Sequence, residues 1–141
     1  MRRLLVLLPT AALAASLSAC GGSAVFDIPV GSCMDAASLE GDQVSRIETI
    51  DCAEEHDVEA YASTELTGDT YPGKDAILAE ADEFCLGEFE PFVGTPYQES
   101  DLSFSFLYPT EESWTSSEDR EILCLVIAPE PVTGSLRGAA R

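Results

Sequence analysis

Cysteine and histidine are the residue types of this chain best able to do chemistry. The sequence holds five cysteines and a single histidine, His56. The spacing Cys52-x-x-x-His56 could supply half of a zinc site, with Cys33 and a further cysteine completing it. Structural zinc sites use closely paired ligands such as Cys-x-x-Cys, and no such pair occurs in the sequence. We therefore expect no metal and no cofactor, and we favour disulfides for the cysteines.

The N-terminus carries the pattern of a secretory signal. A short cationic head precedes an apolar run over residues 4–17, which ends in Leu17-Ser18-Ala19-Cys20. This ending resembles the lipobox of a bacterial lipoprotein. The resemblance implies cleavage before Cys20, diacylglycerol on its thiol, and fatty acyl chains such as palmitate. The run of about 14 residues is shorter than the ~20 that a membrane-spanning helix needs. We expect two acyl chains on Cys20 to anchor the protein to the extracytoplasmic face of the cell membrane.

The four cysteines downstream of Cys20 form an even set. An even number of cysteines in a small exported domain indicates a disulfide framework, and four cysteines allow three pairings. We favour Cys33–Cys52, which closes a short loop, and Cys85–Cys124, which joins a predicted helix to a predicted strand. Each bond would stabilise the domain by about 3–4 kcal/mol through loop-closure entropy.

Three other side chains are candidate functional or structural residues. His56 could act as a general base, but a hydrogen-bonded turn histidine is the interpretation that we favour. Trp114 is expected to cap the core rather than to serve as a ligand platform. Arg120 lies among acidic residues, so we expect a structural ion pair where the chain turns into its last predicted strand.

Motifs of nucleophilic catalysis are absent from the sequence, which contains neither Gly-x-Ser-x-Gly nor Ser-x-x-Lys. Two carboxylates could form a glycosidase pair, but among 26 acidic residues some pair always lies close. We therefore expect no catalytic residues and a protein that is not an enzyme.

The charge of the chain is strongly acidic. Removal of residues 1–19 takes away Arg2 and Arg3 and leaves 5 basic residues against 26 acidic ones, a formal charge of 5 − 26 = −21. Such a surface repels nucleic acid and anionic lipid headgroups. We therefore exclude nucleic acid as a partner and expect contact with the membrane only through lipid on Cys20.

The spacing of apolar residues predicts four strands and one helix. Alternating or continuous apolar runs predict strands over residues 46–52, 58–65, 102–108 and 121–128. The last of these should be a central strand that is buried on both faces and ends at Pro129. A one-sided apolar pattern predicts a helix over residues 74–89, weakened or ended near Gly87.

These elements predict an α+β fold, in which a small antiparallel sheet of about four strands carries one helix on a face and two disulfides, preceded by the lipoprotein signal peptide. The expected organisation is a removed signal peptide over residues 1–19, a lipidated tether over 20–25, one domain over 26–138 and a tail over 139–141.

Several short motifs occur together in the mature chain. They are Val30-Gly31-Ser32-Cys33, Asp51-Cys52-Ala53-Glu54-Glu55-His56-Asp57-Val58-Glu59-Ala60-Tyr61, Tyr71-Pro72-Gly73, Cys85, Phe92-Val93-Gly94, Tyr108-Pro109-Thr110-Glu111-Glu112-Ser113-Trp114, Asp119-Arg120-Glu121-Ile122-Leu123-Cys124 and Thr133-Gly134-Ser135-Leu136-Arg137-Gly138. In combination they resemble the septum formation family of actinobacterial envelope proteins. Two features depart from the family pattern. Glu55 stands where a proline is expected before the histidine, and residues 114–120 lack the usual Gly-Asp-Arg turn.

The resemblance implies a non-catalytic, membrane-attached envelope domain linked to septum formation in cell division. We expect an extracytoplasmic, lipid-anchored domain that binds a protein or a cell-wall component. Two alternatives remain open. One is an exported hydrolase that uses acidic residues or His56, and the other is a structural spacer without a specific ligand.

Overall fold

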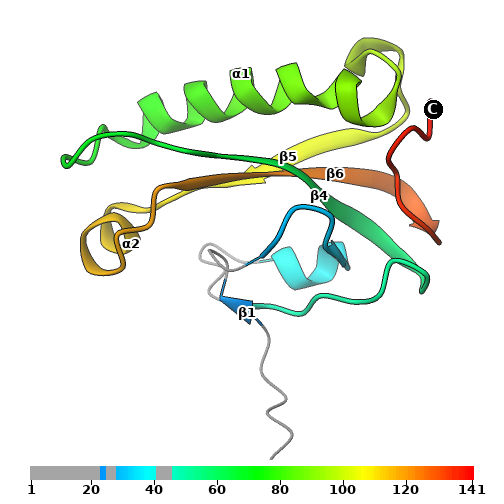
Figure 1. The fold of residues 1–141 in the computed structure, drawn as a ribbon, viewed down its shortest axis with the longest axis horizontal. Helices are drawn as coiled ribbons and strands as arrows, with labels where there is room; N and C mark the ends of the chain where they lie inside the picture. Colours follow the sequence, from blue (N-terminus) through cyan, green and yellow to red (C-terminus); the bar gives the residue numbers. More distant parts are fainter. Residues whose placement is uncertain (1–22, 25–27, 41–45) are drawn as a thin grey trace, which may run out of the picture.

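A four-stranded antiparallel sheet with one long helix across a face forms the body of the molecule (Figure 1). The computed structural model describes residues 23–24, 28–40 and 46–141, so the expected signal peptide and Cys20 lie outside the described residues. The strand order is β2-β4-β6-β5, comprising β2 (Cys33–Met34), β4 (His56–Glu65), β6 (Glu121–Val132) and β5 (Ser103–Leu107). The predicted α+β fold is confirmed.

The segment predicted as a strand over residues 46–52 does not belong to this sheet. Only β3 (Arg46–Ile47) is a strand there, and it pairs with β1 (Ser23–Ala24) in a separate two-stranded sheet. Ile50 adds a single bridge to Cys33. Neither face of the segment is purely apolar, so a longer strand would bury polar groups on either side. The short β2 takes the fourth place in the main sheet instead.

Helix α1 (Lys74–Val93) packs on the sheet through residues spaced four apart, Ile77, Ala81, Cys85, Phe89 and Val93. The helix does not end near Gly87, as the sequence predicts. It runs through Pro91 to a left-handed cap at Gly94 (φ 87°), whose N–H donates to the Glu90 carbonyl. Burial of Phe92 and Val93 outweighs the one helical hydrogen bond that Pro91 removes.

Strand β6 is the central strand, and its apolar run is buried on both faces as predicted. Ile122, Cys124 and Val126 belong to the core beneath α1, whereas Leu123 and Leu125 face the opposite side. The predicted end at Pro129 is wrong, because the strand continues to Val132. The pairing of β4 with β6 is irregular between His56 and Val58. Pro129 and Pro131, near the end of β6, therefore lie outside the regular hydrogen-bonded ladder.

Two apolar clusters lie on the two faces of the sheet. The helix-side core is rich in aromatic residues, including Tyr61, Phe89, Phe92 and Trp114. The second cluster, on the other face, is aliphatic and contains Ile28, Met34, Ile47, Val58, Ala60, Leu123 and Leu125. Among the residues that the structure describes, no helix is long and apolar enough to cross a membrane.

Both predicted disulfides are present. Cys33–Cys52 spans 19 positions of the sequence and links β2 to the loop before β4. Cys85–Cys124 spans 39 positions and links α1 to β6. The first ties β2, at one edge of the main sheet, to the loop before β4, and the second joins the helix layer to the sheet layer.

Candidate functional site

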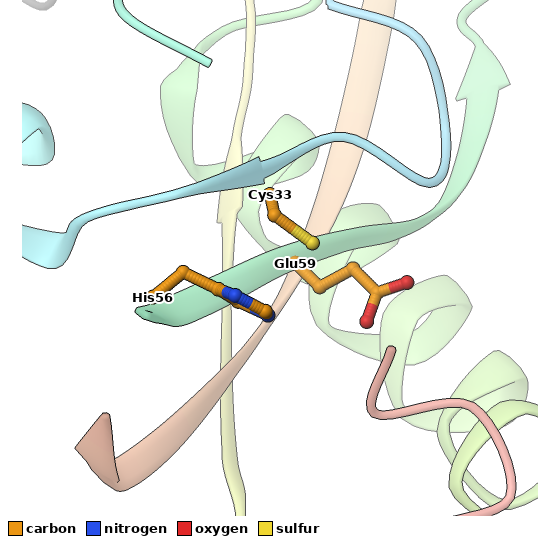
Figure 2. Close-up of side chains that lie close together, drawn as sticks. All are labelled: Cys33, His56 and Glu59. Carbon is orange, nitrogen blue, oxygen red and sulfur yellow. The ribbon is translucent and has the colours of Figure 1, made fainter. Parts of the chain in front are cut away.

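Three side chains capable of chemistry meet where β2 pairs with β4. One ligand atom each from Cys33, His56 and Glu59 lies within 4.8 Å of the others, and all three residues are buried (Figure 2). Within residues 23–24, 28–40 and 46–141, this is the one group of cysteine, histidine and acidic side chains with the closeness that a metal ion requires. We call Cys33, Cys52, His56 and Glu59 the polar cluster.

Strand register brings these side chains together. Cys33 and Glu59 are direct partners in the antiparallel pairing of β2 with β4, so both side chains point to the same face of the sheet. His56 begins β4, three residues earlier, and regular alternation would turn it to the other face. The register shift between His56 and Val58 breaks that alternation, and His56 joins the same cluster.

His56 is completely buried, and only one of its two ring nitrogens has a hydrogen-bond partner among the described residues. Its Nδ1 lies 2.9 Å from the carbonyl oxygen of Glu54. Because a carbonyl only accepts, we assign the proton of the neutral ring to Nδ1, which leaves a lone pair on Nε2. The Nε2 atom has no hydrogen-bond partner among the described residues. A buried polar atom without a partner costs free energy, so the position requires an explanation beyond packing.

Glu59 is 2% exposed and is bound by the C-terminal segment, residues 133–140. The hydroxyl of Ser135 donates to Oε1 at 2.8 Å, and the backbone N–H of Leu136 donates to Oε2 at 2.6 Å. The N–H of Gly134 also donates to the Cys52 carbonyl at 2.6 Å. Glu59 of β4 and Cys52 of the loop before it therefore both hold the C-terminal segment against the polar cluster.

A second set of predicted residues lies elsewhere, at the start of β6. Trp114, in α2 (Glu111–Ser116), is 2% exposed and packs in the helix-side core, which confirms its predicted role as a core residue. Arg120 stacks on it, with the guanidinium carbon 3.6 Å from the ring centroid. Arg120 donates to the carbonyl oxygens of Trp114, Asp119 and Gly68, so backbone carbonyls take the place of the ion pair that the sequence predicts.

Tyr61 connects the helix-side core to the disulfide of α1. Its hydroxyl donates to the Cys85 carbonyl at 2.5 Å, and its ring contacts Phe89 and Phe92. Burial, and secondarily the charge of Glu88, raises the pKa of the phenol. The hydroxyl therefore stays protonated and keeps its donor role.

Comparison with known proteins identifies the family. A family model described as septum formation matches residues 30–140. The chain belongs to the septum formation family. The resemblance stated from the sequence motifs is thus confirmed.

Two curated relatives are similar to this septum formation protein. Both are named putative lipoprotein LppN, one from Mycobacterium tuberculosis (strain ATCC 25618 / H37Rv) and one from Mycobacterium bovis (strain ATCC BAA-935 / AF2122/97). Each is 28% identical over 121 residues, which cover 82% of this chain. The chain spans 63% of the length of these relatives. No solved structure matches it closely enough to extend the comparison.

Sequence reasoning identified part of the polar cluster of the septum formation domain. It selected Cys33, Cys52 and His56, and the structure brings these together. It missed Glu59 and its partner Ser135. One signal was available in the sequence. Glu59 and Tyr61 lie on the same side of a strand, and a carboxylate on a side that faces the core must find hydrogen-bond donors.

The cluster offers nitrogen, oxygen and sulfur donors, but its chemistry is restricted in the oxidised protein. The sulfur of Cys33 is bonded to Cys52, so it supplies no thiolate. His56 has no exposed surface, so an external substrate would reach its ring only after the chain opens. In this state the cluster acts as a buried junction that joins β2, β4 and the C-terminal segment.

Proposed function

We propose that this septum formation domain is a non-catalytic, lipid-anchored module of the cell envelope. It acts at the extracytoplasmic face of the cell membrane and binds a protein or a cell-wall component connected with septum formation. The observation that carries the proposal is the pair of disulfides, Cys33–Cys52 and Cys85–Cys124. Structural disulfides of this kind form and persist in oxidising compartments outside the cytosol.

Two further findings support the lipid anchor. The sequence Leu17-Ser18-Ala19-Cys20 has the form of a lipobox, and the two curated relatives are named putative lipoproteins. A diacylglyceryl group carries two acyl chains, and two chains suffice for stable anchoring. Only two residues separate Cys20 from β1 (Ser23–Ala24), so the domain would lie close to the bilayer.

The distribution of functional groups supports a binding role over the hydrolase alternative. His56 and Glu59, the acid–base candidates of the polar cluster, are buried and hydrogen-bonded within the fold. The surface is dominated by carboxylates, with a formal charge of −21 for residues 20–141 from 5 basic and 26 acidic residues. Such a surface favours a cationic or neutral partner over an anionic one.

The anchor is tested by substitution of Cys20. Cys20→Ala is expected to shift the protein from the membrane fraction to the soluble fraction, because the acyl chains are lost. Ser63→Ala, an exposed change on β4, is the matched control and should remain in the membrane fraction. A Cys20→Ala protein that still fractionates with membranes would reject lipid anchoring.

The binding role is tested by crosslinking in intact cell envelopes. Wild-type protein is expected to enrich a defined set of division or wall-associated proteins, and Cys20→Ala should lose that set because it no longer resides at the membrane. Crosslinking that recovers the same background from both proteins would contradict the binding proposal and leave the spacer alternative.

A further inference from the structure

We propose that the polar cluster becomes a zinc site when the Cys33–Cys52 bond is reduced. The four ligands are the two released thiolates, Nε2 of His56 and the carboxylate of Glu59. This differs from the expectation of no metal drawn from spacing. The fourth ligand is Glu59, which strand pairing supplies, rather than a further cysteine.

The orientation of His56 points to a metal. Its Nδ1–H donates to the Glu54 carbonyl, its Nε2 lone pair has no partner among the described residues, and one ring nitrogen lies within 4.8 Å of ligand atoms of Cys33 and Glu59. Metal-ligating histidines adopt this arrangement, in which a backbone carbonyl fixes one ring nitrogen and the other binds the ion. Within the described part of the oxidised chain no hydrogen bond satisfies Nε2, whereas a zinc ion would.

The distances suit a small tetrahedral ion after a modest contraction. Atoms of Cys33, His56 and Glu59 lie within 4.8 Å of one another. Zinc–sulfur and zinc–nitrogen bonds of about 2.3 and 2.0 Å place neighbouring ligands roughly 3.5 Å apart. Ligand movements on the order of 1 Å would therefore close the site. The Cys52 sulfur already lies at the cluster, because it is bonded to that of Cys33.

The reaction that opens the site is balanced by a dithiol reductant. A dithiol transfers two electrons and two protons to the Cys33–Cys52 bond, which breaks into two thiols while the reductant closes into its own disulfide. Zn²⁺ then replaces the two thiol protons, which pass to water. The resulting set of two thiolates, one imidazole and one carboxylate fills the four positions of a structural zinc site.

Exposure makes this bond the accessible one. Cys52 is partly exposed, whereas Cys85, Cys124 and Cys33 are completely buried. An incoming thiolate can therefore reach the Cys52 sulfur while the helix-side bond stays intact. The metal would enter through the opening made when Cys52 separates from Cys33.

The test is a zinc titration of the purified mature chain in the presence of a chromophoric chelator. Brief treatment with a dithiol, followed by alkylation and mass spectrometry of a sample, should show thiols only at Cys33 and Cys52. We expect one zinc per reduced chain and none per oxidised chain. Cobalt in place of zinc should give the absorption of a tetrahedral ion with thiolate ligands.

Two variants and one control locate the ligands. His56→Gln and Glu59→Gln should each weaken zinc binding by at least about tenfold in the reduced protein. Glu55→Gln, an exposed change on the loop just before β4, should leave the zinc affinity unchanged. The circular dichroism of each oxidised variant reports whether it folds, and the cobalt spectrum of the wild-type protein tests the site even if a variant does not.

Three results would overturn the proposal. The first is a reduced wild-type chain that binds no zinc. The second is equal zinc affinity in the oxidised and reduced forms. The third is wild-type affinity in folded His56→Gln and Glu59→Gln, which would assign the metal to the thiols alone.

Discussion

The two disulfides of this domain lie in opposite surroundings. Cys85 and Cys124 are both completely buried in the helix-side core, and the hydroxyl of Tyr61 binds the Cys85 carbonyl. Cys33 is buried, but its partner Cys52 is partly exposed. The first bond therefore has apolar and aromatic neighbours, and the second has His56 and Glu59.

The comparison shows that the length of the loop that a disulfide closes does not by itself determine how the bond behaves. Sequence separations of 19 and 39 predict loop-closure contributions of about 3 and 4 kcal/mol, which are nearly equal. Surroundings separate the two bonds much more clearly. The helix-side bond is a permanent link between layers, whereas the bond at the polar cluster is open to exchange and adjoins groups that can bind a cation.

Removal of each disulfide is the largest expected effect. The double substitution Cys85→Ala with Cys124→Ala should lower the free energy of unfolding by about 4 kcal/mol, and more if the emptied core does not repack. The double substitution Cys33→Ala with Cys52→Ala should cost about 3 kcal/mol. Denaturant unfolding under non-reducing conditions measures both, and a larger loss at the Cys33–Cys52 pair would reverse the comparison.

Glu59→Gln probes the polar cluster with an intermediate effect. The amide keeps the shape of the carboxylate but replaces one acceptor oxygen by a donor that faces Ser135 or Leu136. We expect a loss of about 2 kcal/mol in the free energy of unfolding. Glu55→Gln is the exposed control and should change it by less than about 0.5 kcal/mol. Equal stabilities of the two variants would remove Glu59 from its anchoring role.

Tyr61→Phe probes the helix-side core through its response to pH. The pKa of Tyr61 is raised in the folded chain, whereas tyrosine in the unfolded chain ionises near 10. The contribution is therefore fully present below about pH 10 and is lost as pH rises further. Tyr61→Phe should lower the unfolding free energy by about 1 kcal/mol at pH 7. It should also flatten the decline of stability above pH 10, and an unchanged decline would contradict the assignment.

The effect expected for Ser135→Ala on stability is as small as that of Tyr61→Phe at pH 7. This change removes the hydroxyl that donates to Oε1 of Glu59 and leaves the bond from Leu136 intact. A loss of about 1 kcal/mol is expected, together with faster hydrogen exchange of the Leu136 amide. Exchange at Leu136 that matches the wild-type rate would show that Ser135 does not hold the C-terminal segment.

The sequence predicted those elements whose pattern has a single solution. The buried run of β6 and the four-residue spacing of α1 require an apolar environment, and both were predicted correctly. The ends of these elements were not. Pro91 is tolerated because burial of Phe92 and Val93 outweighs one lost backbone hydrogen bond, and Pro129 is tolerated because it lies in the irregular part of the pairing between β4 and β6. Residues 46–52 misled because their alternation is polar on both faces.

The candidate site was predicted only in part, for a topological reason. Cys33, Cys52 and His56 stand out as residue types, so composition alone identifies them. Glu59 is one of 26 acidic residues; its position beside Tyr61 on one side of a strand hints at burial, but only the register of β2 on β4 places it next to Cys33. Ser135 lies 76 positions from Glu59 in the sequence, and no local sequence pattern predicts a contact over that separation.

The measurement that tests the central claim most directly is the intact mass of the protein purified from native envelopes, before and after alkylation without reductant. The account predicts a chain of residues 20–141 that carries a diacylglyceryl group on Cys20 and takes up no alkyl groups, because the other four cysteines are paired. A full-length, unacylated chain that is alkylated at Cys33, Cys52, Cys85 and Cys124 would contradict it.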